Sequence, residues 1–259
     1  MFEMLDLKKI NKEVTDYGYI IIHGAIDELA IEEMRNYWIN YYSDIKISAE
    51  EVIWSPYLGE ENQTCYSDDG FQCLHRTYDY LWNESVHKLT RNICLDLQKI
   101  KNKAFGKPEG NGLEYSSKNF GLYVSTSCYP ENIGHLGMHR DKNDGKDMLV
   151  HYIVPLTIQG EDYKSGGLVL QLENGKMIDV DSLMRKGSIL FYNAGLSHGV
   201  EKIVPFPNKS SIGRIQTFGI TTNFIKPLYS KKLWEDINLK KYLTYKVVSA
   251  KNKFLKKIL

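Results

Sequence analysis

The most constraining feature of this sequence is a series of short segments with β-strand character between positions 113 and 225. Turn residues separate each segment from the next. Strands are expected over 120–127, 149–157, 167–171, 177–180, 188–192, 199–204 and 215–222. Many short strands at regular spacing predict a β-sandwich or a β-barrel.

Helices are expected before this series of strands, over 5–16, 28–42 and 84–101. Gly18 ends the first helix, a short apolar strand follows at 19–22, and Asp27 can cap the second helix. The segment 43–82 is rich in aromatic residues and in helix breakers, so we expect it to be irregular. Helices first and strands second predict an α+β fold, with the helices packed on the outside of the sheet layer.

The composition is that of an ordinary globular protein, since 42% of the 259 residues are hydrophobic and 25% are charged. We expect one domain, 1–259, made of a mostly helical support and substrate-entrance region (1–112), a strand core (113–225) and a C-terminal tail (226–259). The N-terminal segment 1–12 lacks the apolar core of a signal peptide, and no stretch approaches the roughly 20 apolar residues that span a bilayer. These observations predict a cytoplasmic protein without a transmembrane segment.

Charge is unevenly distributed along the chain. The tail 226–259 holds ten lysines against Glu235 and Asp236, a net charge of +8, whereas the region 1–225 carries −7 of the total of +1. The tail is either a helix that lies on an anionic membrane surface or on a partner, or a solvated terminal helix packed by its apolar residues, and the second is the simpler expectation. The acidic character of 1–225 argues against a nucleic-acid substrate, which would need a basic groove.

Two histidines and a carboxylate stand out among the polar residues of the strand region. In a strand, alternate residues point the same way, so His139 and Asp141 would face one side together. His198 comes several expected strands later in the chain and lies beside another expected strand. Two histidines and one carboxylate on one face of an octahedron leave three positions open, which suits Fe(II), a bidentate co-substrate and O₂. The sequence therefore predicts an iron site made by His139, Asp141 and His198.

An arginine adds to this pattern. Arg214 follows His198 across an apparent loop and opens the last expected strand. A buried arginine needs an anionic partner, and the distal carboxylate of 2-oxoglutarate would supply one through a bidentate pair. Gln216 lies on the same face and could donate to the same carboxylate. The plainer alternative for Arg214 is a surface salt bridge.

Several segments together resemble the Fe(II)/2-oxoglutarate oxygenases, and most closely the phytanoyl-CoA dioxygenase-like branch. The matching segments are 16–22, His139-Arg140-Asp141, 165–168, 186–191, 197–200 and 213–214. The resemblance implies a double-stranded β-helix, also called a jelly roll or cupin-like fold, with the metal inside one mouth. The chain departs from the branch in a longer gap between His198 and Arg214 and in lacking a long Pro-Gly-Ser-His loop after Gly167.

The resemblance also implies an activity: an oxidoreductase that uses Fe(II), 2-oxoglutarate and O₂ to hydroxylate, or otherwise oxidise, a C–H bond of a small molecule. The modest length and the single domain fit a dioxygenase that modifies a small molecule in a biosynthetic pathway. Asp141 argues against a halogenase, because related halogenases replace the carboxylate by a small residue. Two alternatives stay open, an oxygenase acting on a protein or nucleic acid and a catalytically inactive binding module with the same fold.

Other residues carry weaker signals. His151 could point into the barrel near the co-substrate or be a satisfied core histidine, and Tyr123 has the same two readings on its own strand. His135 and His139 are four apart and could bind zinc on a helix, but Gly134 and Gly137 oppose a helix there.

Overall fold

The computed structural model describes residues 2, 5–44, 62–68, 70–113, 120–141 and 148–223, and the structural statements below concern these residues. They form the α-helices α1 (Leu7–Tyr17), α2 (Glu28–Asp44) and α3 (Lys88–Ala104) and the short 3₁₀ helix η1 (Asp181–Leu183). The strands are β1 (Tyr19–Ile22), β2 (Gln63–Asp68), β3 (Gln72–Tyr80), β4 (Phe120–Tyr129), β5 (His135–His139), β6 (Val150–Pro155), β7 (Ser165–Gln171), β8 (Met177–Asp179), β9 (Ile189–Asn193), β10 (Ser197–Val204) and β11 (Arg214–Asn223).

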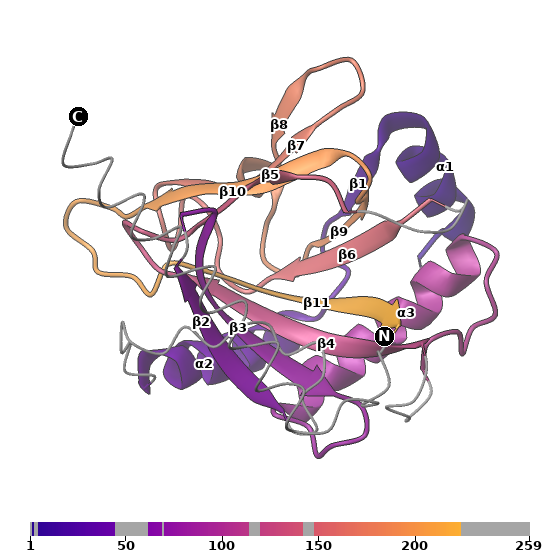
Figure 1. Ribbon diagram of the computed structural model, residues 1–259, viewed down its shortest axis with the longest axis horizontal. Coiled ribbons are helices and arrows are strands. Elements are labelled where there is room, and N and C mark those ends of the chain that lie inside the picture. The colour runs from indigo at the N-terminus through magenta and orange to yellow at the C-terminus, as the bar shows by residue number, and fades with distance from the viewer. Residues whose placement is uncertain are drawn as a thin grey trace, which may run out of the picture.

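The strands form one antiparallel sheet that curls back on itself (Figure 1). Its strand order is β1-β9-β6-β11-β4-β3-β5-β10-β7-β8, and β2 pairs with β3 off this path. Strand β3 pairs with β4 along most of its length and with β5 at its beginning, so it joins the two layers. The result is the expected α+β fold, a jelly roll with helices outside.

Residues next to the helices fix where α1 begins and ends and where α2 begins. The Asp6 side chain accepts a hydrogen bond from the backbone N–H of Lys9 at 3.0 Å and caps α1. Gly18 ends that helix at φ +88°, a conformation that glycine adopts without the strain of a Cβ atom. The Asp27 carboxylate accepts from the backbone N–H groups of Leu29 and Ala30, which confirms it as the cap of α2.

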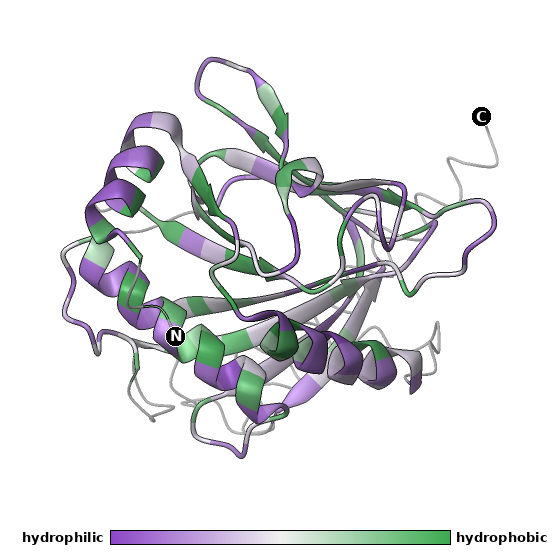
Figure 2. Ribbon diagram, turned by 180° about the vertical axis from the view of Figure 1, so that it is seen from behind, coloured by the Kyte–Doolittle hydropathy of each residue, from purple (hydrophilic) through white to green (hydrophobic). Residues whose placement is uncertain are grey.

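The larger hydrophobic core lies between the helices and the outer face of the sheet. Figure 2 shows hydrophobic stripes on the helices beside the strands. From the helices, Ile10, Trp38 and Leu97 are at most 2% exposed. They pack in one cluster with outward-facing sheet residues, including Val124, Tyr152, Phe191 and Ile215. Burying this apolar surface holds the helices on the sheet, so the opposite face is left as the interior of the jelly roll.

A second cluster fills part of that interior. On β6 and β9 its residues alternate with the outward-facing ones, and β7 and β11 add to it; its members include Ile153, Leu168, Leu170, Leu190, Tyr192 and Phe218. Polar residues share this inner face, as strand pairing places Ser127 of β4 between Arg76 of β3 and Gln216 of β11. An interior that is apolar at one place and polar at another can hold a small polar ligand.

The expectation of irregular structure over 43–82 was wrong for 63–68 and 72–80, which form β2 and β3. The basic tail at 226–259 lies outside the described residues. In the part of the chain that the structure describes, no helix is both long and apolar enough to cross a membrane.

Candidate metal centre

The two candidate histidines are neighbours in the sheet. His139 is the last residue of β5, His198 is the second residue of β10, and strand pairing sets them opposite each other. Their rings lie 4.3 Å apart, centroid to centroid. Asp141 was expected to lie in the same strand as His139, but it lies just beyond the end of β5. Its backbone N–H donates to the carbonyl of Ala194 at 3.0 Å. That hydrogen bond fixes the segment so that the carboxylate still meets the histidines.

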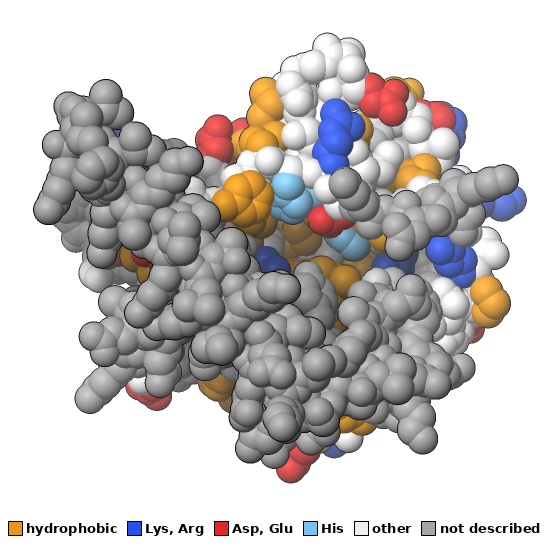
Figure 3. All heavy atoms as spheres, in the orientation of Figure 1, with side chains coloured by type: hydrophobic (Ala, Val, Ile, Leu, Met, Phe, Trp, Pro, Cys, Tyr) orange, Lys and Arg blue, Asp and Glu red, His pale blue; other side chains and the backbone are white. Residues whose placement is uncertain are grey.

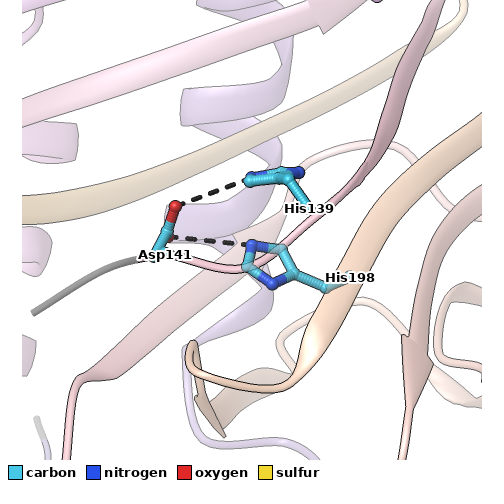
Figure 4. Close-up of side chains that lie close together, drawn as sticks. All are labelled: His139, Asp141 and His198. Atoms are coloured by element: carbon cyan, nitrogen blue, oxygen red, sulfur yellow. Dashed lines mark ion pairs between the residues drawn. The ribbon is translucent and has the colours of Figure 1, made fainter.

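The ligand atoms of these three residues converge on one point (Figure 4). A carboxylate oxygen of Asp141 lies 3.6 Å from Nε2 of His139, and the other lies 3.7 Å from Nε2 of His198. All three residues offer ligand atoms within 4.8 Å of one another. Neighbouring ligand atoms of an octahedral ion with bonds of about 2.1 Å are about 3 Å apart, so small side-chain rotations would bring these atoms onto one metal ion. The residues therefore fit a metal held by two histidines and a carboxylate.

Hydrogen bonds to the backbone select the ligating nitrogen of each histidine. Nδ1 of His139 lies 2.9 Å from the carbonyl oxygen of Gly137, and Nδ1 of His198 lies 2.9 Å from that of Leu196. A carbonyl only accepts, so Nδ1 carries the proton and Nε2 keeps its lone pair toward the candidate site. Burial lowers the pKa of His198 to about 4, so this ring is neutral at pH 7.

A third histidine stands behind the carboxylate. Nε2 of His151, on β6, lies 2.9 Å from the second carboxylate oxygen of Asp141. Burial on its own raises the pKa of Asp141, but the hydrogen bond with His151 and the nearby histidine charges outweigh it and keep that pKa below its usual value. His151 therefore points toward the candidate metal centre and orients the Asp141 carboxylate. The sequence had offered two roles for His151, a place near the co-substrate or a core histidine, and neither named this contact with Asp141.

Arg214 is buried, as a residue that binds a co-substrate carboxylate would be, but it already has an anionic partner. Its Nε and Nη2 donate to the two carboxylate oxygens of Asp181 in η1, the second at 3.0 Å. The side chains of Arg214 and Asp181 are 1% and 4% exposed, which rules out the surface salt bridge. Tyr163 donates its hydroxyl to the same carboxylate at 2.5 Å. Nη1 of Arg214 has no hydrogen-bond partner among the described residues.

The two remaining candidates lie on the inner face of the sheet. Gln216 is 5% exposed, and its Oε1 atom has no hydrogen-bond partner in the described part of the chain. Tyr123 is 2% exposed and packs in an aromatic cluster with Tyr78 and Tyr80 of β3. Neither residue contacts His139, Asp141 or His198 in any interaction that the described residues show. Of the candidate site residues, the structure therefore places His151 beside the candidate metal triad.

The candidate metal triad is open to one face of the molecule. Figure 3 shows histidine side chains and an acidic side chain together in a hollow of this face, beside hydrophobic side chains. Phe71 and Met138 are 48% and 44% exposed, and the Phe71 ring packs edge-on against His139 at 6.0 Å. A separate cavity of about 1120 Å³ lies between α1, β1 and the β7–β8 hairpin, and none of the triad lines it. The candidate metal site is therefore identified by the chemistry of its side chains and not by this cavity.

Solved structures match the chain along most of its length. A prolyl-4-hydroxylase from Pseudomonas putida has a TM-score of 0.57 at 12% identity, over 83% of this chain and 98% of that one. A prolyl hydroxylase from Trichoplax adhaerens, solved with a peptide fragment of hypoxia inducible factor, has a TM-score of 0.55 at 14% identity, over 84% and 89%. A non-heme α-ketoglutarate-dependent carbocyclase of nogalamycin biosynthesis has a TM-score of 0.54 at 11% identity, over 85% of both chains.

The chain therefore has the fold of the Fe(II)/2-oxoglutarate oxygenases, which confirms the fold that the sequence resemblance implied. At these identities the likeness establishes the fold, and the activity has to be argued from the site. None of these three structures is described as a member of the phytanoyl-CoA branch, so the closer resemblance stays a prediction. No protein-family model and no curated protein sequence matches the chain.

Proposed function

We propose that this protein is an Fe(II)- and 2-oxoglutarate-dependent dioxygenase that oxidises a C–H bond of a small molecule. The observation that carries the proposal is the convergence of His139, Asp141 and His198 at the open mouth of a jelly roll. This donor set, two imidazoles and one carboxylate, is typical of non-haem iron sites that leave positions open for a co-substrate and O₂.

Each residue of the centre has a distinct task. Nε2 of His139 and of His198 would bind the iron, and Asp141 would supply the charged ligand. His151 would hold the Asp141 carboxylate in place by the hydrogen bond of 2.9 Å. When bound, iron and 2-oxoglutarate together activate O₂, so the chain's contribution is to bind and orient these groups.

The inner face of the sheet would receive the rest of the co-substrate. The 2-oxo acid end of 2-oxoglutarate would bind the metal, and the distal carboxylate would then reach into the jelly roll. Arg214 can still donate one hydrogen bond through Nη1, and the Gln216 amide lies on the same face of β11. We assign both residues to the floor of the co-substrate pocket, and Tyr123 to its aromatic wall.

A small molecule is the substrate class that the mouth favours. Phe71 and Met138 present apolar surface beside the candidate metal, which favours a substrate with an apolar part near the oxidised carbon. Among proteins of this fold, the carbocyclase belongs to nogalamycin biosynthesis and the Trichoplax adhaerens enzyme was solved with a peptide. A peptide substrate is therefore the second candidate.

The proposal is tested by co-substrate turnover. Purified protein with Fe(II), ascorbate and O₂ should convert 2-oxoglutarate to succinate, and the rate should rise when the right compound of a small-molecule library is added. An Asp141→Ala variant should lose the stimulated succinate release, because the metal then lacks one of three protein ligands. Equal succinate release by wild type and by Asp141→Ala would contradict the proposal.

A further inference from the structure

Strand β1 lies at one end of the sheet and has an unpaired edge. Among the described strands it pairs only with β9. The carbonyl of Gly18 accepts from the backbone of β9 at 2.8 Å, so in the alternating pattern of an antiparallel pair Ile20 and Ile22 also bond to β9. The N–H and C=O groups of Tyr19 and Ile21 therefore point away from β9, and no hydrogen bond joins them to any other described residue.

The side chains of β1 are covered on both faces of the sheet. Ile20 and Ile22 pack against the larger cluster beneath the helices, and Tyr19 and Ile21 pack against the inner cluster. All residues from Tyr19 to His23 nevertheless line the cavity of about 1120 Å³ beside α1. Because residues of both faces line it, this cavity runs along the unpaired edge of the strand. We call it the β1 groove.

The β1 groove has an apolar wall on the inner side of β1. In Figure 1, α1 and the β7–β8 hairpin lie on either side of this strand. The hairpin lines the groove with Leu172 and Ile178, which belong to the inner cluster. Leu196 closes one end, since a Cβ atom at Gly18 would lie 2.6 Å from its Cδ1. Apolar side chains of a ligand would therefore pack on the hairpin side.

The opposite wall is acidic. Helix α1 lines the groove with three carboxylates and one lysine: Asp6, Glu13, Asp16 and Lys9. Lys12 pairs with Asp16 at 2.6 Å, whereas Glu13 makes no ion pair with a described residue. On the hairpin, the charges of Glu173 and Lys176 offset each other. The groove as a whole therefore favours a ligand with positive charge on the α1 side.

The shape of the groove decides what can pair with β1. An unpaired strand edge is a template for a further strand. The edge of β1 is recessed between α1 and the hairpin, so the β1 edge of a second copy, flanked by the same two walls, would be kept away. A single extended segment can enter. Successive side chains of such a strand would point alternately to the hairpin and to α1.

We propose that the β1 groove binds an extended segment of a partner protein as an added strand, and that apolar residues alternate with lysine or arginine in this segment. Backbone hydrogen bonds to Tyr19 and Ile21 would supply the pairing, and the two walls would select the side chains. This inference goes beyond the proposed function and does not depend on it, because none of the metal triad lines the groove.

Binding of a defined probe tests the proposal. The probe is a fluorescent heptapeptide of alternating lysine and valine, long enough to pair with Tyr19 to His23, and its affinity is measured by polarisation. It should bind with one site per chain. A peptide with glutamate in place of lysine should bind about 10-fold more weakly or worse. The lysine–valine peptide N-methylated at every amide keeps its side chains but cannot donate to β1, so it should not bind.

A matched pair of variants tests the acidic wall. Glu13→Gln should weaken binding of the lysine–valine probe about 2- to 5-fold, as expected for loss of an exposed ion pair. Glu201→Gln removes an equal charge from an exposed position of β10, outside the groove, and should leave the affinity unchanged. Equal weakening by the two variants would show that the probe responds to overall charge, and would overturn the proposal.

Amide hydrogen exchange of wild-type protein, followed by NMR, locates the probe without any variant. In free protein the amides of Tyr19 and Ile21 should exchange faster than those of Ile20 and Ile22, and the probe should slow them. No binding of the probe, or protection only at other amides, would overturn the proposal. Slow exchange of Tyr19 and Ile21 without probe would also overturn it: dependence on protein concentration would identify a second copy as the occupant, and independence would identify a segment of the same chain.

Discussion

At the scale of single residues, the candidate centre depends on hydrogen bonds that orient each ligand. Backbone carbonyls hold Nδ1 of His139 and His198, and His151 holds the Asp141 carboxylate. These outer contacts fix which atom of each side chain faces the metal. The convergence of His139, Asp141 and His198 was predictable from the sequence, because H-x-D and a later histidine beside a strand form a recognisable spacing. His151 was only a candidate, because nothing in its neighbours shows which way the ring points.

Removal of either histidine ligand should abolish metal binding. His139→Ala or His198→Ala leaves two protein ligands of three, and Fe(II) affinity measured by anaerobic calorimetry should fall below detection. The matched control is His135→Ala, since His135 lies on the same strand but its Nδ1 contacts the carbonyl of Ile133 and it is outside the triad. Metal affinity that is unchanged in His198→Ala would refute the ligand assignment.

Loss of the His151 contact should weaken the centre without destroying it. In His151→Ala the Asp141 carboxylate loses its hydrogen bond, and metal affinity should fall about 10- to 100-fold. His151→Gln keeps a side-chain donor and should recover part of the loss. A purely structural role would instead lower the melting temperature in both variants and leave the metal affinity of the folded fraction at the wild-type value.

Asp181 shows the limit of residue-level prediction. It lies in a 3₁₀ turn with no motif around it, and it is far from Arg214 in the sequence. Only the fold reveals that it neutralises the arginine that the sequence assigned to the co-substrate.

At the scale of elements, β3 shows why the segment 43–82 was wrongly expected to be irregular throughout. Its outward-facing residues include His75, Thr77 and Asp79, and its inward-facing ones include Arg76 and Tyr78. Because polar residues lie on both faces, the apolar–polar alternation that marks a half-buried strand is missing. The helices were predicted well, since their apolar residues recur at helical spacing and caps such as Asp27 and Gly18 lie at their ends.

Helix α3 carries a lysine whose burial makes stability depend on pH. Lys101 is 8% exposed, and its Nζ lies 5.6 Å from the centre of the Tyr152 ring. Burial, with a smaller effect of Lys107, lowers the pKa of Lys101 from 10.5 to about 7. Above pH 7 the unfolded chain therefore holds a proton that the folded chain has released, so the free energy of unfolding should rise with pH.

The measurement is urea unfolding at several values between pH 7 and about 8.5, below the usual pKa of a cysteine thiol. Lys101→Met should be more stable than wild type at pH 7, and the Lys101 contribution, up to about 1.4 kcal/mol per pH unit, should be absent from its profile. Lys103→Met, at an exposed position of the same helix, should keep the wild-type slope. Parallel profiles for wild type and Lys101→Met would show that Lys101 stays protonated when folded.

At the scale of the whole molecule, the fold separates two tasks. The outer face of the sheet and the helices bury the larger apolar core, and the curled inner face keeps polar residues beside a smaller apolar cluster. The candidate metal ligands come from the ends of β5 and β10, which lie side by side because these two strands, distant in the sequence, pair directly with each other. Chain topology, more than any local propensity, therefore creates the centre.

The central claim is that His139, Asp141 and His198 hold a metal to which 2-oxoglutarate binds. The most direct measurement is an anaerobic spectrophotometric titration of Fe(II)-loaded protein with 2-oxoglutarate. Wild-type protein should develop a visible metal-to-ligand charge-transfer band that saturates at one equivalent per chain, and His198→Ala should give none. No band from wild-type protein that has bound iron, or the same band from His198→Ala, would contradict the account.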